Sequence, residues 1–209
     1  AGLKRLDISG TLATASSSST SDLVELAQAF YKYLTSSNNK LTHLNVADNK
    51  GVMSTSLAGA NGISGIFGAA GTTGSGVPTT TTTSTTSTSS SPSSHHCVTV
   101  LSSILLALFL PSSAPVKSLD ISNNAGLDAI GHVVGDLLRV NQRLQSLRLD
   151  GNLIGFNGWQ SIYAGLTQPK RPNATMFDMP IPTFDLTKAT KTLPYGRQQM
   201  FLSMLANLK

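Results

Sequence analysis

A nine-residue pattern of apolar and polar positions recurs along the chain. In LQSLRLDGN (residues 144–152) the first, fourth and sixth positions are apolar and the ninth is asparagine. Copies begin at Leu3, Leu41 and Val116, and a degenerate copy begins at Met176. We call this pattern the repeat frame. A unit repeated in this way predicts that each copy forms one strand and that the copies stack on one another.

Side-chain alternation assigns a direction to each position of the repeat frame. Along a strand, the fourth and sixth positions face one side and the third, fifth and seventh face the other. The ninth position follows the strand, where an asparagine amide can bond backbone groups that would otherwise be buried and unpaired. We therefore expect a structural ladder of Asn49, Asn124 and Asn152, with Thr11 as a weaker substitute in the first copy.

The spacing between copies indicates which kind of repeat this is. Val116 and Leu144 are 28 residues apart, which leaves room for a helix after each strand. Apolar residues recur at helical spacing in residues 23–34, 127–138 and 159–166. Asp22 and Glu25 resemble a capping box at the start of the first helix. The pattern predicts an α/β leucine-rich repeat solenoid, with a curved parallel sheet inside and helices on the convex side.

One copy of the repeat is much longer than the others. Leu41 and Val116 are 75 residues apart, and the excess lies in residues 51–94, which are rich in glycine, serine and threonine. Such a segment buries too little surface to offset the entropy of ordering it, so we predict a flexible insertion. An apolar helix from about His96 to Leu110 should complete this turn.

The predicted organisation is an array of about five strands in residues 1–185 and a C-terminal helical cap in residues 186–209. Pro180 and Pro182 lack backbone donors and should end the sheet. The cap should present one apolar stripe that includes Met200 and Phe201.

Composition narrows the functional classes. Only 12% of residues are charged, about half the usual share, while serine and threonine make up about a quarter. Cys97 is the single cysteine, which excludes a disulfide framework and a multi-thiolate zinc site. The longest apolar run, residues 98–110, is too short for a membrane span, and the first residues lack a secretory signal pattern. The chain starts inside a repeat without methionine, so we expect a piece of a longer protein.

The outward positions of the strands predict a partner-binding surface on the concave face. Its members are Arg5, Asp7, His43, Asn45, Ser118, Asp120, Arg148, Asp150 and Asp178. This surface is mixed to slightly acidic, although the chain carries a formal charge of +5. Nucleic-acid binding would need clustered basic residues with aromatic residues among them, so we predict none.

Candidate chemistry is sparse. His43, Ser118 and Asp120 share the concave face, but no nucleophile-elbow motif accompanies them. The run His95-His96-Cys97 could contact a metal, yet adjacent ligands at a helix start are weak evidence for a site. Asn173 begins a glycosylation sequon, which we attribute to chance because no secretory signal is recognisable. The sequence thus predicts no enzyme, no cofactor and no metal.

The last third of the chain has a more particular likeness. Three segments within residues 116–190 carry it: VKSLDISNN, the following GLDAIGHVVGDLLRVNQRLQSLRLDGNLIGFNGWQSIYAGL, and MPIPTFDLTKA. Together they resemble the leucine-rich repeat domain of the CARMIL family of actin regulators. The repeats of that family are of the ribonuclease-inhibitor type. The resemblance implies a cytoplasmic scaffold that engages actin-assembly machinery. The family's capping-protein-binding and lipid-binding segments lie outside its repeats, so neither activity is expected in this chain.

These observations predict a non-enzymatic protein-interaction scaffold within a larger CARMIL-like regulator of actin assembly. The alternative is a GTPase-activating leucine-rich repeat protein of the Ran-regulator type, which would use an exposed asparagine or arginine. The oligomeric state and the identity of the partner stay open.

Overall fold

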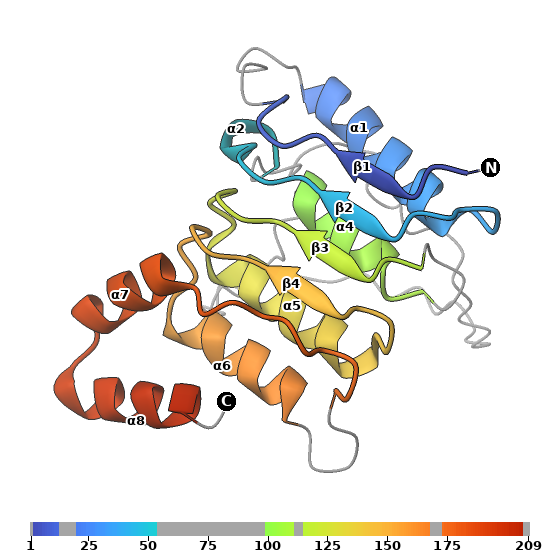
Figure 1. Cartoon of the computed structure of the whole chain (residues 1–209). Helices are drawn as coiled ribbons and strands as arrows, with labels where there is room; N and C mark the ends of the chain where they lie inside the picture. Colours follow the sequence, from blue (N-terminus) through green and yellow to red (C-terminus); the bar gives the residue numbers. More distant parts are fainter. Residues whose placement is uncertain (1, 13–19, 54–98, 111–114, 168–172, 207–209) are drawn as a thin grey trace, which may run out of the picture.

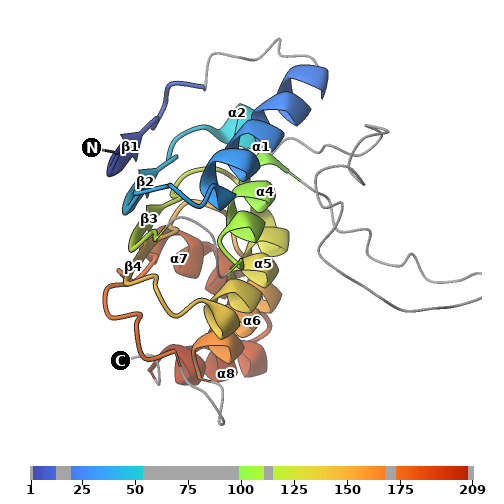
Figure 2. The same cartoon turned by 90° about the vertical axis from the view of Figure 1, so that its right-hand side faces the viewer.

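A computed structural model of the chain describes residues 2–12, 20–53, 99–110, 115–167 and 173–206. One parallel sheet contains the strands β1 (Arg5–Asp7), β2 (His43–Asn45), β3 (Ser118–Asp120) and β4 (Ser146–Arg148), in chain order. The helices α1 (Thr20–Thr35), α2 (Lys50–Met53), α4 (Val100–Ala107), α5 (Leu127–Val140) and α6 (Phe156–Leu166) lie on one side of it (Figures 1 and 2). Two further helices follow, α7 (Thr183–Thr192) and α8 (Tyr195–Ala206). This mixed α/β architecture is compatible with an α/β repeat fold.

The strand register follows the repeat frame. The fourth position of each copy pairs with the fourth position of the next, so that Leu44 lies between Leu6 and Leu119, and Leu119 also pairs with Leu147. Because equal positions are neighbours, each row across the sheet contains residues of one frame position. The outward rows therefore bring together residues that are far apart in the sequence.

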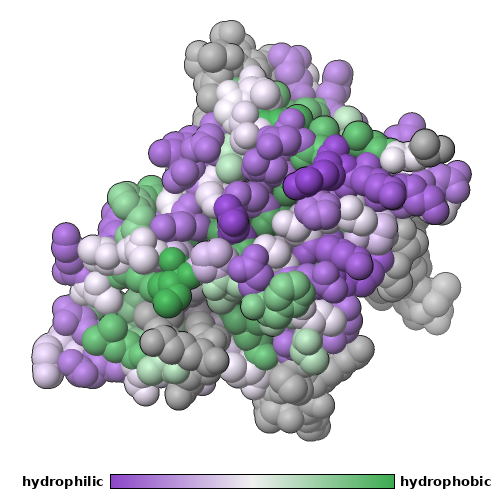
Figure 3. All heavy atoms as spheres, in the orientation of Figure 1, coloured by the Kyte–Doolittle hydropathy of each residue, from purple (hydrophilic) through white to green (hydrophobic). Residues whose placement is uncertain are grey.

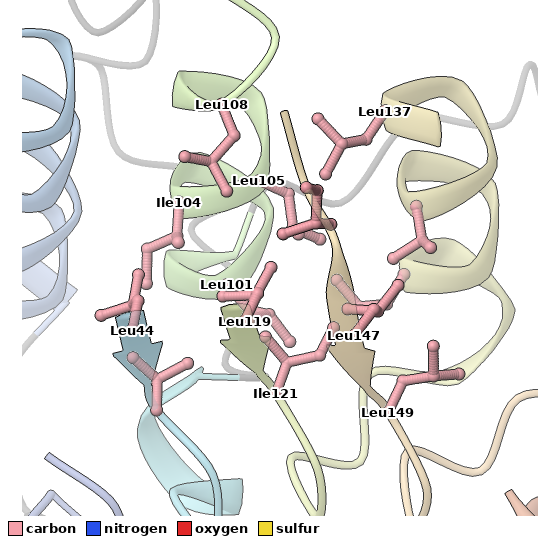
Figure 4. Packing of buried hydrophobic residues seen from close by; sticks show 14 of the residues in the cluster. Leu44, Leu101, Ile104, Leu105, Leu108, Leu119, Ile121, Leu137, Leu147 and Leu149 are labelled. Carbon is pink, nitrogen blue, oxygen red and sulfur yellow. The ribbon is translucent and has the colours of Figure 1, made fainter. Parts of the chain in front are cut away.

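The core lies between the sheet and the helices. In the copies of β2, β3 and β4, the first, fourth and sixth positions are at most 2% exposed. Figure 4 shows Leu119 and Leu147 pointing from their strands toward side chains of α4 and α5, among them Leu101, Leu105 and Leu137. The first copy is less buried, because β1 has a neighbouring strand on one side only.

Two helix starts differ from the sequence prediction. Helix α1 begins at Thr20, so Asp22 lies in its first turn and is not the capping residue. Helix α4 begins at Val100, later than His96, because Thr99 caps it. The Thr99 hydroxyl accepts from the Ser102 N–H at 3.0 Å, and the Ser102 hydroxyl accepts from the Thr99 N–H at 2.6 Å. This reciprocal pair satisfies two backbone donors at the helix start.

Helices α5 and α6 pack with their backbones unusually close. A Cβ atom on Gly131 would lie 2.5 Å from the Cα atom of Gly158, and one on Gly135 would lie 2.4 Å from the Ser161 carbonyl oxygen. On the other helix, a Cβ atom on Gly165 would lie 2.2 Å from the Gly135 carbonyl oxygen. No side chain fits at these positions without moving a helix, so the glycines set the distance between α5 and α6.

The fifth copy of the repeat frame forms no strand in the described part of the chain. It joins the sheet through a single parallel bridge between Ser146 and Asp178, supported by the Leu147 N–H, which donates to the Asp178 carbonyl at 2.9 Å. Pro180 and Pro182 follow, and neither has an N–H that could continue the pairing. The expected five strands are therefore four strands and one bridge.

The C-terminal segment forms two helices where the sequence predicted one cap. Pro194 separates α7 from α8, since proline disfavours a helical conformation at the residue before it. In α8, Phe201 is fully buried and its ring meets Phe156 edge-on at a centroid distance of 5.7 Å. Met200, expected on the apolar stripe, is 52% exposed.

The predicted insertion, residues 51–94, falls mainly outside the described residues. Its first three residues belong to α2, and Val52 is buried in the core. Residues 54–98, including His95, His96 and Cys97, lie outside the description. None of the helices in the described ranges has the length and hydropathy that a membrane span requires.

Candidate binding groove

A groove of about 640 Å³ lies over the sheet on the face opposite the helices. Eight of the nine predicted partner-binding residues line it, namely Arg5, Asp7, His43, Asn45, Ser118, Asp120, Arg148 and Asp178. All four strands contribute, and the segment after α6 contributes Asp178. In Figure 3, hydrophilic residues gather over β1, β2 and β3, and hydrophobic residues are more frequent toward the C-terminal segment.

Asp150, the ninth predicted residue, does not line the groove. Its carboxylate accepts from the backbone N–H groups of Phe184 at 3.2 Å and Asp185 at 3.1 Å. Both groups belong to the first turn of α7, where backbone donors have no partner within the helix. Asp150 therefore holds the start of α7 against the loop that follows β4.

Three acceptors in the groove also shape the backbone. The side-chain oxygens of Asp7, Asn45 and Asp120 each accept the N–H two residues further on, at 3.0 Å in every case. Such a bond forms an Asx-turn, which ends a strand. The fifth position of the repeat frame thus turns the chain out of β1, β2 and β3. The alternation of side chains along a strand predicts only that these residues face outward, where a partner could bind. It does not show that they also shape the backbone.

Asp7 is the most completely bonded of these carboxylates. It accepts from the Ser9 N–H, from the Ser9 hydroxyl at 2.7 Å and from the Asn45 amide at 3.1 Å. The bond from the Ser9 N–H, followed by that from the Ser9 hydroxyl, lowers the pKa of Asp7 below its ordinary value. The Asp7 side chain therefore stays ionised to lower pH than an isolated aspartate.

The residues of the suggested catalytic constellation are close but not connected. His43 and Ser118 are register partners on β2 and β3. The His43 Nδ1 atom lies 2.9 Å from the Thr42 hydroxyl, and Asp120 accepts from the Ser122 N–H. In the described part of the chain, no hydrogen bond joins His43 to Ser118 or Asp120. His43 is therefore not hydrogen-bonded to the Ser118 hydroxyl that it would have to activate.

The groove also contains residues that the sequence analysis did not assign to a site. Lys117, Gln145 and Phe177 all line it, and all three occupy the second position of the repeat frame. Ser146 lines it as well and donates its hydroxyl to Asp178 at 2.7 Å. The second position precedes the strand, so side-chain alternation does not predict which way its side chain points. The three residues share this position of the repeat frame, and that is the only sequence signal that links them.

The asparagine ladder lies at the rim where the chain leaves the strands. Asn49, Asn124 and Asn152 are fully buried. The Asn124 side chain accepts from the Asn49 N–H at 2.9 Å, and the Asn152 side chain accepts from the Asn124 N–H at 3.2 Å. Their amide groups donate to carbonyl oxygens of their own turn and of the turn before. Each asparagine therefore joins two adjacent turns.

Asp185 continues this ladder with a different chemical group. Its carboxylate accepts from the Asn152 N–H at 3.0 Å and the Leu153 N–H at 2.8 Å, and it is fully buried. Burial raises the pKa of Asp185, against the lowering effect of these bonds. The fifth copy of the repeat frame has no asparagine at its ninth position, so the frame gave no signal for this residue.

The eighth position of the repeat frame carries a signal that the sequence analysis did not use. Gly10, Asp48, Asn123 and Gly151 all occupy it, and all four have a positive φ between 56° and 80°. Glycine, asparagine and aspartate adopt this left-handed conformation most readily. Their recurrence just before the ninth position marks the turn out of each strand.

Asn173, the sequon residue, has a structural role. Its amide donates to the carbonyl oxygens of Leu138 at 2.8 Å and Asn141 at 3.1 Å. Asn141 makes an equivalent bond to the Leu108 carbonyl at 2.9 Å. These two asparagines hold the ends of α4 and α5 to the segment that follows the next helix, and both amide hydrogens of Asn173 are already engaged.

Comparisons with known proteins add little to this description. No protein-family model matches the chain, and neither does any curated protein. Three chains of solved structures match it. One is described as the actin-binding site 2 of leiomodin-1, with 21% sequence identity and a TM-score of 0.35, over 54% of this chain and 75% of that one. A superposition this weak supports no conclusion about the function of this chain. Among the described residues, no group of three or more His, Cys, Asp or Glu side chains could hold a metal ion.

Proposed function

We propose that the chain is part of a leucine-rich repeat array that binds a protein partner in the groove, within a larger CARMIL-like regulator of actin assembly. The observation that carries this proposal is the convergence of eight outward residues, seven from the four strands and Asp178 from the segment after α6, on one open groove. A surface built from rows of short polar side chains suits a protein segment laid across the strands. The proposed scaffold is cytoplasmic and has no catalytic activity of its own.

Two further observations support the repeat assignment. The strands pair in the register of the repeat frame, and the asparagines at its ninth position bond one turn to the next. The connection to actin assembly is supported by the resemblance of residues 116–190 to the CARMIL repeats.

Site-specific photo-crosslinking tests the proposed groove. Ser118 lies at its centre, so a benzoylphenylalanine in its place should capture the partner from a cell extract. The matched control places the same group at Gln160, an exposed residue of α6 on the opposite side. We expect a protein captured from position 118 only, competed away by the unmodified chain. Actin-assembly proteins among the products would support the CARMIL-like assignment, and equal capture at both positions would contradict the groove.

A second candidate function rests on Arg148. Its side chain is exposed at one end of the groove, and among the described residues it forms no hydrogen bond or ion pair. An arginine placed in this way could stabilise the transition state of a bound GTPase, an effect of about 10³-fold or more where it occurs. Single-turnover GTP hydrolysis by small GTPases should be unchanged by the chain if it is a scaffold. Acceleration that is lost in Arg148→Ala would favour the GTPase-activating alternative.

A further inference from the structure

We propose that the groove selects acidic protein segments that carry an aromatic or large aliphatic residue. This inference rests on the proposed function, because it names the chemistry of the partner that the groove would bind. It differs from the expectation drawn from the sequence, in which the row of aspartates gives the surface a slightly acidic character.

The acidic side chains of the groove are already used within the protein. Asp7 accepts three hydrogen bonds, and Asp120 accepts one from the Ser122 N–H. Asp178 accepts the hydroxyl of Ser146. Asp7 and Asp120 also form the Asx-turns that end their strands. A basic ligand would share these carboxylates with bonds that the protein already makes, which makes them weaker recognition groups than unbonded carboxylates.

The basic side chains of the groove are unoccupied. Arg5, Lys117 and Arg148 are exposed, and within the described ranges none of their side chains forms a hydrogen bond or an ion pair. Arg5 lies on the first strand and Arg148 on the fourth, so the two guanidinium groups stand at opposite ends of the groove. A guanidinium binds a carboxylate through two parallel N–H donors. An acidic segment laid across the strands would therefore find a cation at each end.

Phe177 supplies the apolar part of the proposed recognition. It lines the groove and is 78% exposed, although the groove is otherwise mainly polar. Its N–H donates to the Gln145 carbonyl at 3.2 Å, which fixes the backbone beneath the ring. Aromatic residues held in this way provide much of the affinity in protein interfaces. A ligand side chain that covers this ring would be aromatic or large and aliphatic.

The charge of the whole chain favours the same partner. The formal net charge of +5 attracts an acidic segment at long range, before any direct contact forms, and it repels a basic segment. A nucleic acid is also acidic, but its continuous phosphates would meet three carboxylates along the groove. A peptide can place its acidic residues beside the arginines and its neutral residues beside Asp7, Asp120 and Asp178.

Selection from a displayed library of random dodecapeptides tests the proposal with the whole 209-residue chain. The selected peptides are labelled, and their affinities are measured by fluorescence anisotropy. We expect enrichment of glutamate and aspartate together with one aromatic or large aliphatic residue. Arg5→Glu combined with Arg148→Glu should weaken binding at least about tenfold, and Phe177→Ser about tenfold. Higher salt should weaken binding to the wild-type chain.

The matched control is Lys188→Glu combined with Lys191→Glu. Both lysines are exposed on α7, so the net charge changes by the same amount while the groove stays intact. Affinity within about twofold of wild type is expected for this variant, since only the long-range attraction changes. All variants must retain the wild-type melting temperature. A loss of affinity equal to that of the groove variant would overturn the proposed contacts.

The other outcomes also decide between the proposals. Enriched basic or neutral peptides, or groove-dependent binding of a labelled single-stranded oligonucleotide, would overturn the acidic-peptide proposal. If no peptide binds in a groove-dependent way while Ser118 still crosslinks a protein, the ligand chemistry is wrong and the protein-binding function stands. If neither experiment detects binding at the groove, the proposed function fails as well.

Discussion

The turns that contain β3 and β4 differ from the turn that contains β1, although all three follow the same repeat frame. At the fourth position, Leu119 and Leu147 are fully buried, whereas Leu6 is only partly buried. At the first position, Leu144 is fully buried and Leu3 is 52% exposed. The frame specifies which side chains face the helices. Burial is completed by the neighbouring turns, so equal sequence positions contribute unequally to stability.

The same difference appears in the hydrogen bonds at the ninth position. Asn124 is buried, and its side chain bonds both its own turn and the preceding one. Thr11 is exposed, and its hydroxyl donates only to the Ile8 carbonyl of its own turn, at 2.7 Å. An asparagine joins two turns because its side chain has both a donor and an acceptor. The threonine has a single hydroxyl hydrogen, and within the described ranges its side chain bonds only its own turn.

The largest expected effect comes from a charge in the central core. Leu147→Asp should cost more than about 4 kcal/mol and abolish cooperative unfolding, because it buries a carboxylate without a partner. Leu6→Asp should cost only about 1 kcal/mol, since Leu6 remains partly in contact with water. Urea denaturation followed by circular dichroism measures both. Equal losses would show that burial by neighbouring turns does not govern stability.

The asparagine ladder should give the next largest difference. Asn124→Ala leaves the Asn49 N–H and the carbonyls of Val46 and Ile121 without this partner, at a cost of about 3 kcal/mol. Thr11→Ala removes a bond at an exposed site and should cost less than about 1 kcal/mol. The free energies of unfolding of the two variants test this order. A larger loss for Thr11→Ala would contradict the assignment of the ladder.

Asp185 should be intolerant of the conservative change to asparagine. Its two carboxylate oxygens each accept one buried N–H, and an amide offers only one acceptor oxygen. We expect Asp185→Asn to cost about 1–3 kcal/mol. Hydrogen exchange at Asn152 and Leu153 should increase together with this loss. Unchanged protection at both amides would show that the carboxylate is not their acceptor in solution.

The pH dependence of Asp185 has a defined sign. Because burial raises the pKa of its carboxyl, the folded chain binds this proton more readily than the unfolded chain. The wild type should gain stability relative to Asp185→Asn as the pH falls through the raised pKa. The gain should end below 3.8, the ordinary value, where the unfolded carboxyl is protonated too. Denaturation at a series of pH values detects this difference.

Asp7, at the opposite end of the sheet, should show the smallest effect and the opposite sign. Hydrogen bonds from Ser9 lower its pKa, so its contribution to stability is present above 3.8. The contribution is lost as the pH falls through the lowered pKa. Asp7→Asn should lack this acid-side loss and otherwise resemble the wild type. Proton–carbon NMR titration of the aspartate carboxyls would observe the pKa directly, and an unshifted value would contradict the Asx-turn of β1.

Local repetition made much of this architecture predictable. The repeat frame located β1 to β4, the buried positions and the three asparagines, because each depends on a pattern within nine residues. Asp185 was not predictable, since its partners, Asn152 and Leu153, are more than thirty residues away. The pattern assigns Asp150 to the partner-binding surface, because it cannot show that α7 begins beside this residue. The groove likewise required the register of the strands, which brings Phe177 next to Gln145.

The close packing of the α5 and α6 backbones at their glycines has a consequence for the opposite face of the molecule. A helix with its side chains is about 10 Å wide, whereas neighbouring strands are about 4.8 Å apart. In a solenoid, stacking one helix per strand therefore spreads the helical side more than the sheet and bends the array toward its sheet face. The glycines bring α5 and α6 close together, so we expect them to reduce that spread beside β3 and β4. A larger side chain at one of these glycines should therefore change the width available to a ligand, although no groove ligand would touch it.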